Sequence, residues 1–460
     1  MENFWDYSVW GWFNVLAVLL MSLLAAKALK KVVPILNASL IPTSVLGGGI
    51  LLIVAGVYKL ITGNVMFDEP FFGASGTTTL EIITYHCLAL GFVASTLKAG
   101  GGKMGKKRAG EILNTGVTTV STYLLQAVVG FGITMIVAAV IDGFFPAAGI
   151  LLPFGFGQGT GQAMNYGNIY ELEYGFVGGK SFGLTIAALG FLSASLGGVA
   201  HLYYLKKKGH ILDRGRGDSA LDMGEIQAEG EIPMQESMDK ITVQLAFIAL
   251  AYFIAQLMII GLAQLIPGMK SVIYGFNFLL GVAAAAIVKA VLNFLNRKGF
   301  VRRKHTNDFL MTRCSNFFYD LMVVAGVAAI RLGILESYWG VMLILGVAGL
   351  IVTYIYNLTV AKRLFPEYPQ EQFLMMYGML TGTASTGVIL LREIDGDFKT
   401  PAADNMVYQN LPAIALGFPM MLLATLAPKK PALTMVILVV FFLALQVVLF
   451  RSYLFNRKKK

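Results

Sequence analysis

The sequence predicts an all-α integral membrane protein of about 11 transmembrane helices, built as two inverted five-helix repeats that each contain a re-entrant hairpin. The first observation behind this prediction is composition. The 460 residues are 56% hydrophobic and 13% charged, whereas soluble domains are about 45–50% apolar and about 25% charged. The second is a series of apolar runs of helical length, and the third is a pair of apolar stretches that glycine and hydroxyl residues interrupt.

Apolar runs long enough to cross the ~30 Å hydrocarbon core of a bilayer recur throughout the chain, and the mean hydropathy is +0.69. We expect transmembrane helices at residues 8–29, 41–62, 80–97, 113–141, 176–205, 241–266, 270–295, 314–335, 339–361, 404–426 and 431–455. The lipid bilayer is therefore the first partner that the sequence predicts.

Two further apolar stretches, 147–166 and 372–391, differ from these runs because glycine, serine and threonine interrupt them. Each is too short to cross the membrane twice. Irregular backbone at membrane depth survives only where protein buries it or where it lines a water-filled cavity. We therefore interpret both stretches as re-entrant hairpins.

Basic clusters near residues 27–31, 98–108, 206–208, 297–313 and 362–363 indicate the orientation of the chain. Lysine and arginine accumulate in cytoplasmic loops. All five clusters share one side if the N-terminus is outside and the C-terminus inside. The exceptions are Lys270, Lys429 and Lys430.

The two halves of the chain follow the same order of helices and hairpin. We divide the chain into a first repeat at 1–205, a cytoplasmic linker at 206–240, a second repeat at 241–426, and an additional C-terminal helix with a basic tail at 427–460. Because five spans are an odd number, the second repeat enters the membrane from the opposite face. Secondary transporters with such repeats bind substrate at the repeat interface near the bilayer midplane.

The first hairpin contains the segment LPFGFGQGTGQAMNYGN, residues 152–168, with glycine at every second position from 155 to 161. Such backbone leaves carbonyl and amide groups free to bind a cation or an anion. We predict that the substrate binds to Gly157, Gln158, Gly159, Thr160 and Gly161. We predict that a sodium ion binds to the neutral side-chain oxygens of Gln162 and Asn165. The alternative is a glycine-rich helix that packs closely on its neighbours.

The second hairpin contains MYGMLTGTASTGVILLRE, residues 376–393. Its predicted substrate ligands are Thr383, Ser385, Thr386 and Arg392, and the predicted sodium ligands are Thr381, Gly382 and, on the span at 314–335, Asp320. Charged residues inside spans are costly and indicate function. The alternatives are that the hydroxyls bond to their own helix, that Arg392 is an interfacial anchor, and that Asp320 is solvated at the cytoplasmic interface.

The sequence contains no motif that indicates an enzyme. It contains no P-loop, HExxH motif or Ser-His-Asp grouping, and Cys87 and Cys314 lack metal-binding spacing. We expect no cofactor beyond sodium as coupling ion. The net charge of +10 falls in short blocks between apolar runs, as topology signals do, so nucleic acid is not an expected partner. A passive channel is the remaining alternative class.

Several motifs resemble the bacterial glutamate:sodium symporter family: IPTSVLGGGILL at 41–52, LGFVASTLKAGGG at 90–102, GQGTGQA at 157–163, YGFVGGKSFGLTIAALG at 174–190 and TGTAST at 381–386. The resemblance implies sodium-coupled uptake of glutamate or a related anionic amino acid by a homodimer in the bacterial inner membrane, with an elevator movement. The family's hairpin positions correspond to Gly157, Gly159, Thr160, Gly161, Gly382 and Thr386.

Three departures from the family pattern lie where substrate would bind. Gln158 stands where the family commonly has histidine, Ser385 replaces a proline, and residues 390–392 replace more polar ones. These differences leave a second cargo class open. On the same fold, the alternative is ion-coupled transport of a dicarboxylate or a 2-hydroxycarboxylate.

Overall fold

The computed structural model describes residues 3–38, 41–98, 106–209, 231, 238–267, 270–300, 303–331, 338–395 and 399–451. These residues are mostly helical and contain no strand. Within the same ranges, nine helices are long and apolar enough to cross a membrane. The chain is an all-α, multi-pass membrane protein. Most of the predicted linker at 206–240 and the end of the basic tail lie outside the described residues.

The helices of the first half are α1 (Tyr7–Val32), α2 (Pro34–Ala38), α3 (Thr43–Thr62), η1 (Met66–Asp68), η2 (Pro70–Phe72), α4 (Gly76–Leu97), α5 (Lys106–Val140), η3 (Pro146–Ile150), α6 (Leu151–Tyr174) and α7 (Gly179–Lys207). Those of the second half are α9 (Lys240–Leu265), α10 (Lys270–Gly275), α11 (Asn277–Arg297), α12 (Asp308–Ala328), α13 (Trp339–Leu364), α14 (Pro369–Thr381), α15 (Ala384–Arg392), α16 (Ala402–Tyr408) and α17 (Asn410–Leu426). Last comes α18 (Pro431–Leu449).

Two predicted spans are interrupted in the structure. The span at 270–295 is divided between α10 and α11, and the span at 404–426 between α16 and α17. Two predicted spans contain none of the nine helices that are long and apolar enough. In the span at 404–426 the longer helix, α17, has only 17 residues, and in the span at 314–335 helix α12 carries charged residues from its first turn onward. The number of membrane crossings therefore stays a prediction.

Local sequence signals explain where several helices begin and end. Pro369 and Pro431 start α14 and α18, because proline lacks the amide that a first-turn residue leaves unbonded anyway. Asn307 caps α12 by accepting a hydrogen bond from the Leu310 amide. At the other end of a helix, Gly175 terminates α6 with a left-handed backbone conformation, which glycine adopts without steric cost.

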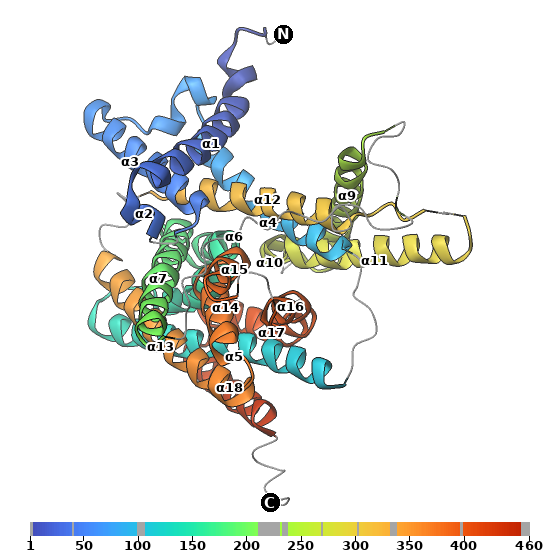
Figure 1. The fold of residues 1–460 in the computed structure, drawn as a ribbon. Coiled ribbons are helices and arrows are strands. Elements are labelled where there is room, and N and C mark those ends of the chain that lie inside the picture. The colour runs from blue at the N-terminus through green and yellow to red at the C-terminus, as the bar shows by residue number, and fades with distance from the viewer. Residues whose placement is uncertain are drawn as a thin grey trace, which may run out of the picture.

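The helices form two bundles (Figure 1). The first bundle consists of α1, α3, α4, α9, α11 and α12; in it α4 packs on α11 and α12, and α3 packs on α1 and α12. The second bundle consists of α5 to α7 and α13 to α18; in it α5 packs on α13, α17 and α18, and α7 packs on α6, α13 and α14. The bundles meet mainly where α6 contacts α4 and α12.

Both predicted hairpins fold back on themselves. In the first, the Phe154 ring stacks on the Tyr166 ring with centroids 3.8 Å apart, and the Phe145 ring stacks on Phe176 at 4.7 Å. In the second, the backbone of α14 approaches that of α15 so closely that a Cβ on Gly378 would lie 2.8 Å from the Gly387 Cα. The hairpins are longer than predicted, because the first extends to residue 174 and the second begins at residue 369.

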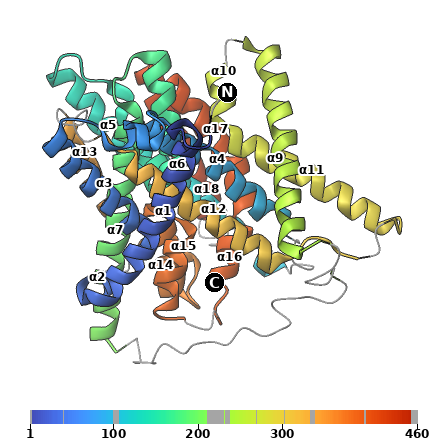
Figure 2. The same ribbon diagram turned by 90° about the horizontal axis from the view of Figure 1, so that it is seen from above.

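Helix α7 shows that the hairpins point toward each other. Its start packs at Gly179 on Gly167 of the first hairpin, and its last turns pack at His201 on Phe373 of the second. Its middle, at Gly190, contacts the tips of both. Figure 2 shows the same arrangement, with α6 toward the end where α10 lies and α14 and α15 toward the end where α2 lies.

Candidate functional site

The tips of the two hairpins meet beside α12. A Cβ on Gly159 would lie 3.8 Å from both the Thr383 Cγ2 atom and the Met322 Cε atom. The Thr160 hydroxyl donates to the Met322 carbonyl at 3.3 Å. Gly190 of α7, which contacts both tips, lies 11 residues from Gly179 and 11 residues from His201. At 1.5 Å per residue, the meeting point is therefore roughly 16 Å along α7 from each of these two residues. We call this meeting point the tip junction.

The first hairpin breaks at one glycine. Gly159 has φ 81° and ψ −173°, a backbone conformation that is essentially restricted to glycine. The other three alternating glycines, at 155, 157 and 161, are helical, so only one of the four interrupts the helix. They permit close packing instead: Gly155 on α7, Gly157 on Tyr123 and Gly161 on Leu88. The segment therefore breaks at Gly159 and packs closely on its neighbours at the other three glycines.

The second hairpin breaks at Gly382, where φ is −142° and ψ is −107°. Thr383 and Thr386 then form a capping box at the start of α15, since each hydroxyl accepts from the other residue's amide at 3.4 Å. The Thr381 hydroxyl donates to the Tyr377 carbonyl at 2.6 Å. These three predicted ligands thus have local hydrogen-bond partners, and the side chain of Ser385 lies outside the described part of the structure.

The break in each hairpin directs helix ends at the tip junction. The first arm of each hairpin ends there with carbonyl groups, and the second arm starts there with amide groups. Helix C-termini carry partial negative charge and helix N-termini partial positive charge. The tip junction therefore offers backbone groups that suit a small cation and an anionic group side by side.

Gln162 is the most unusual polar side chain of the first hairpin. It is 1% exposed, and neither its Oε1 nor its Nε2 atom has a hydrogen-bond partner. An unpaired buried polar atom costs about 1–3 kcal/mol, so native proteins seldom keep one without a reason. Gln162 lies one helical turn from the break at Gly159. Among the predicted site residues in the described part of the chain, Gln162 is the one whose buried side chain has both polar atoms without a partner.

Gln126 of α5 was missed by the sequence analysis. It is fully buried, and its Nε2 atom donates to the Leu380 carbonyl at 3.0 Å, immediately before the tip of the second hairpin, and to the Thr353 hydroxyl at 2.8 Å. Its Oε1 atom has no partner. The available signal was the hydroxyl-rich run NTGVTTVSTYLLQ at 114–126, an unusual density of polar residues for a membrane-spanning helix.

Asn165 lies away from the tips. Its Nδ2 atom donates to the Gly275 carbonyl at 3.3 Å, and the residue lines a cavity of about 410 Å³ between α4, α6 and α10. Lys180 and Glu81 also line this cavity and form an ion pair at 2.6 Å between the second and the first bundle. The cavity reaches Asn165 from the end of the molecule where α10 lies.

Asp320 and Arg392 also lie apart from the tip junction. Asp320 is exposed and faces the Ser44 side chain of α3, on the stripe of α12 that includes Val324 and Val327, which pack on α3. Arg392 is exposed at the last residue of α15. Nine residues separate it from Thr383, roughly 13 Å along a helix. Gln158, by contrast, is half-buried next to the break.

Comparisons with family models, with curated proteins and with solved structures give no match for this chain. The resemblance to the glutamate:sodium symporter family stays a prediction, and function is inferred from the geometry of the tip junction. Among the described residues, no group of three or more His, Cys, Asp or Glu side chains is placed to hold a metal ion. The oxygens that the two breaks bring to the tip junction are neutral, among them the carbonyl groups at the ends of the first arms.

Proposed function

We propose that the protein is a sodium-coupled secondary transporter that imports glutamate or a related anionic amino acid across the bacterial inner membrane, with its N-terminus outside and its C-terminus inside. The observation that carries the proposal is the tip junction. Two broken hairpins, one from each half of the chain, meet halfway along α7, and Gln162, one helical turn after the first break, has a buried amide without a partner. Broken helices at mid-membrane depth are how secondary transporters bind ions and substrates.

The contacts between helices support an inverted repeat. Helix α1 packs on α3 as α9 packs on α11, α3 packs on α12 as α11 packs on α4, and α13 packs on α7 as α5 packs on α17. Each pair is obtained from the other by exchanging helices of the first half for their counterparts in the second. Together with hairpins that approach α7 from its two ends, this pattern fits repeats of opposite topology.

The two bundles support an elevator movement. The second bundle holds both hairpins, and it contacts the first mainly through α6. In the proposed cycle, the second bundle carries the tip junction past the first bundle, which remains fixed and provides the contacts of a homodimer. The ion pair between Lys180 and Glu81 joins the two bundles and has to break when they slide.

Coupling follows from two opposite charges at one site. Sodium binds to carbonyl oxygens at the ends of the hairpin arms, and the carboxylate of the substrate binds to amides at the starts of the arms. Each ligand reduces the electrostatic cost of the other, so each raises the other's affinity by the same factor. The Gln162 amide, which has both a donor and an acceptor, completes the hydrogen bonds of the substrate.

Uptake of labelled glutamate into proteoliposomes tests the proposal. We expect accumulation when an inward sodium gradient is imposed and none when potassium replaces sodium on both sides. Uptake that proceeds equally without sodium would refute the coupling. Single-channel currents in a planar bilayer would instead identify a passive channel.

The alternative cargo is a dicarboxylate or a 2-hydroxycarboxylate on the same fold. The observation that favours it is Gln158, a neutral amide at the break of the first hairpin where the resembled family commonly has histidine. Thermal-shift measurements with a panel of amino and organic acids, each with and without sodium, distinguish the two. Stabilisation by malate or citrate but not by glutamate would select the alternative.

A further inference from the structure

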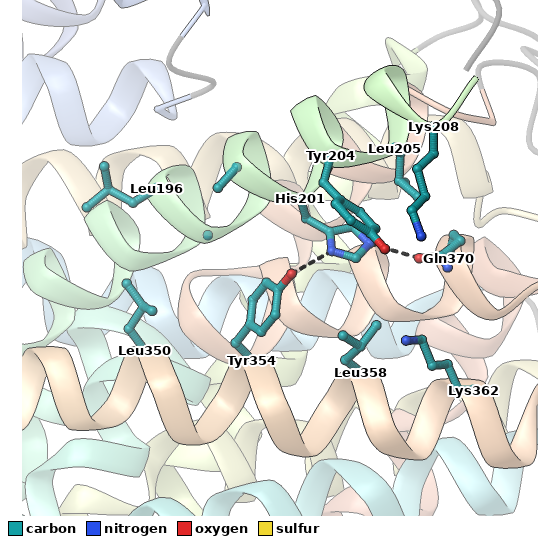
Figure 3. A pocket seen from close by; sticks show the side chains of 12 residues that line it. Leu196, His201, Tyr204, Leu205, Lys208, Leu350, Tyr354, Leu358, Lys362 and Gln370 are labelled. Carbon is teal, nitrogen blue, oxygen red and sulfur yellow. Dashed lines mark hydrogen bonds between the residues drawn. The ribbon is translucent and has the colours of Figure 1, made fainter. Parts of the chain in front are cut away.

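A second cavity, of about 640 Å³, lies in the second bundle (Figure 3). It is formed between the C-terminal parts of α7 and α13, away from the tip junction. Two stripes of side chains at four-residue spacing form its walls. On α7 the stripe consists of Leu196, Ala200, Tyr204 and Lys208. On α13 it consists of Leu350, Tyr354, Leu358 and Lys362. We call this cavity the α7–α13 groove.

Both stripes are apolar at one end and basic at the other. Each begins with leucine, continues through a tyrosine, and ends 12 residues later with lysine. Residues four apart lie on one helix face, and 12 residues span roughly 18 Å. The groove is thus apolar at one end and carries two cations at the other, as the positions of Leu196, Lys208 and Lys362 in Figure 3 show.

The two lysines are the charges that remain available to a ligand. Both are exposed, neither forms an ion pair with a described carboxylate, and no acidic side chain lines the groove. Lys208 lies 4.8 Å from the centre of the Tyr204 ring. His201 is not available, because its Nδ1 atom is hydrogen-bonded with Tyr354 at 2.7 Å and its Nε2 atom with Gln370 at 2.8 Å.

The surroundings of the groove are apolar. Leu192 and Leu196 of α7 are 43% and 66% exposed, and Val347, Ile351 and Ile355 of α13 are 58%, 47% and 60% exposed. Exposed leucine, isoleucine and valine on membrane-spanning helices face lipid chains. A ligand in the groove therefore has an acyl-chain environment beside it along most of its length and meets water only at the lysines.

We propose that the α7–α13 groove binds an anionic phospholipid, with its phosphate between Lys208 and Lys362 and one acyl chain along Leu358, Leu350 and Leu196. The length of the groove decides for a lipid over a soluble anion. Roughly 18 Å is close to one leaflet, since the whole hydrocarbon core is about 30 Å thick. Basic pockets between transmembrane helices are a known way to select anionic headgroups.

Native mass spectrometry of the purified protein, delipidated in neutral detergent, tests the proposal. Phosphatidylglycerol should bind about 25-fold more tightly than phosphatidylcholine of the same chains, because each lysine near the headgroup contributes about fivefold. The K208Q/K362Q variant should bind the two lipids equally. The control is K27Q/K31Q. It removes two exposed lysines of α1 that lie outside the groove, so this variant should keep the preference for phosphatidylglycerol.

Three outcomes would overturn the proposal. Equal affinity of the wild-type protein for the two lipids would show that the lysines do not select a charge. An equal loss of preference in K27Q/K31Q would show a general surface effect. Displacement of phosphatidylglycerol by an equal concentration of glycerol phosphate would show that the groove binds a free anion. In the expected case, glycerol phosphate does not compete, and Leu350→Asn weakens lipid binding several-fold.

Discussion

The two hairpins have the same outline but satisfy their polar groups differently. In the second hairpin, Thr381, Thr383 and Thr386 use their hydroxyls within the hairpin itself. In the first, Gln162 is buried, and neither polar atom of its side-chain amide has a hydrogen-bond partner. The first break needs a backbone conformation that only glycine adopts readily, whereas Gly382 has a negative φ.

This difference assigns separate tasks to the two hairpins. A structure that keeps an unpaired buried amide loses stability, and the loss is recovered when a ligand supplies the missing hydrogen bonds. We therefore propose that the first hairpin is the binding element. The second has a capped helix and the more exposed residue Ala384 at its tip, and we propose that it closes over a bound ligand.

The largest effect is expected from Gly159→Ala. A Cβ there would have ordinary contacts at 3.8 Å, so the cost comes from the backbone, whose φ of 81° is strained for any residue with a side chain. We expect a loss of about 1–3 kcal/mol of stability and loss of uptake. Thermal unfolding in detergent and proteoliposome uptake measure the two.

Gly56→Ala is the matched control for this substitution. Gly56 is helical in α3, and a Cβ there would meet nothing within 4 Å. Alanine is the better helix former by about 1 kcal/mol, so this variant should melt at the same temperature as the wild type or slightly above it. A Gly159→Ala protein as stable and active as the Gly56→Ala protein would contradict the observed break.

The next largest effect is expected from Gln162→Leu, which should reduce uptake without reducing stability. Leucine replaces two unpaired buried polar atoms with apolar ones of similar volume, so in the absence of substrate the melting temperature should stay the same or rise. Uptake should fall by tenfold or more. The Gln126→Leu variant should melt at a lower temperature than the wild type, because the Leu380 carbonyl and the Thr353 hydroxyl lose their hydrogen-bond donor. If Gln162→Leu melts as low as Gln126→Leu, the Gln162 amide has a structural partner.

Thr383→Ala should have a moderate effect that is confined to the second hairpin. The variant removes the side-chain cap of α15, which is worth about 1 kcal/mol. Hydrogen exchange should accelerate at the first amides of α15 and remain unchanged in α6. Thr383→Ser keeps the hydroxyl and should restore protection. Unchanged exchange in Thr383→Ala would mean that the capping box does not hold the tip.

The fold was largely predictable because bilayer thickness imposes a length on every span. The runs at 8–29 and 339–361 correspond closely to α1 and α13. The breaks inside 270–295 and 404–426 were not predicted, because hydropathy alone does not report them. Local signals stand beside both: Gly275 ends α10, and Pro412 lies in the first turn of α17, where proline is tolerated.

The candidate site was predictable only in part. Glycine and threonine patterns located both tips, because a broken helix needs such residues locally. Which polar atoms remain unpaired depends on neighbours distant in sequence, as for Gln126, whose partners lie on α13 and α14. Asp320 illustrates the reverse: its charge suggested a ligand, but its stripe of α12 faces α3 rather than Thr160.

The smallest effect is expected from Arg392→Gln, and it tests the assignment of binding to the first hairpin. Arg392 is exposed at the end of α15, roughly 13 Å along the helix from Thr383. If Arg392 acts as an interfacial anchor, the alternative to substrate binding, stability should change by less than about 0.5 kcal/mol and the KM for uptake by less than about twofold. A charged hydrogen bond to a substrate carboxylate contributes about 1.5–3 kcal/mol. A KM that rises more than about tenfold would therefore place the carboxylate at Arg392 and move the binding element to the second hairpin.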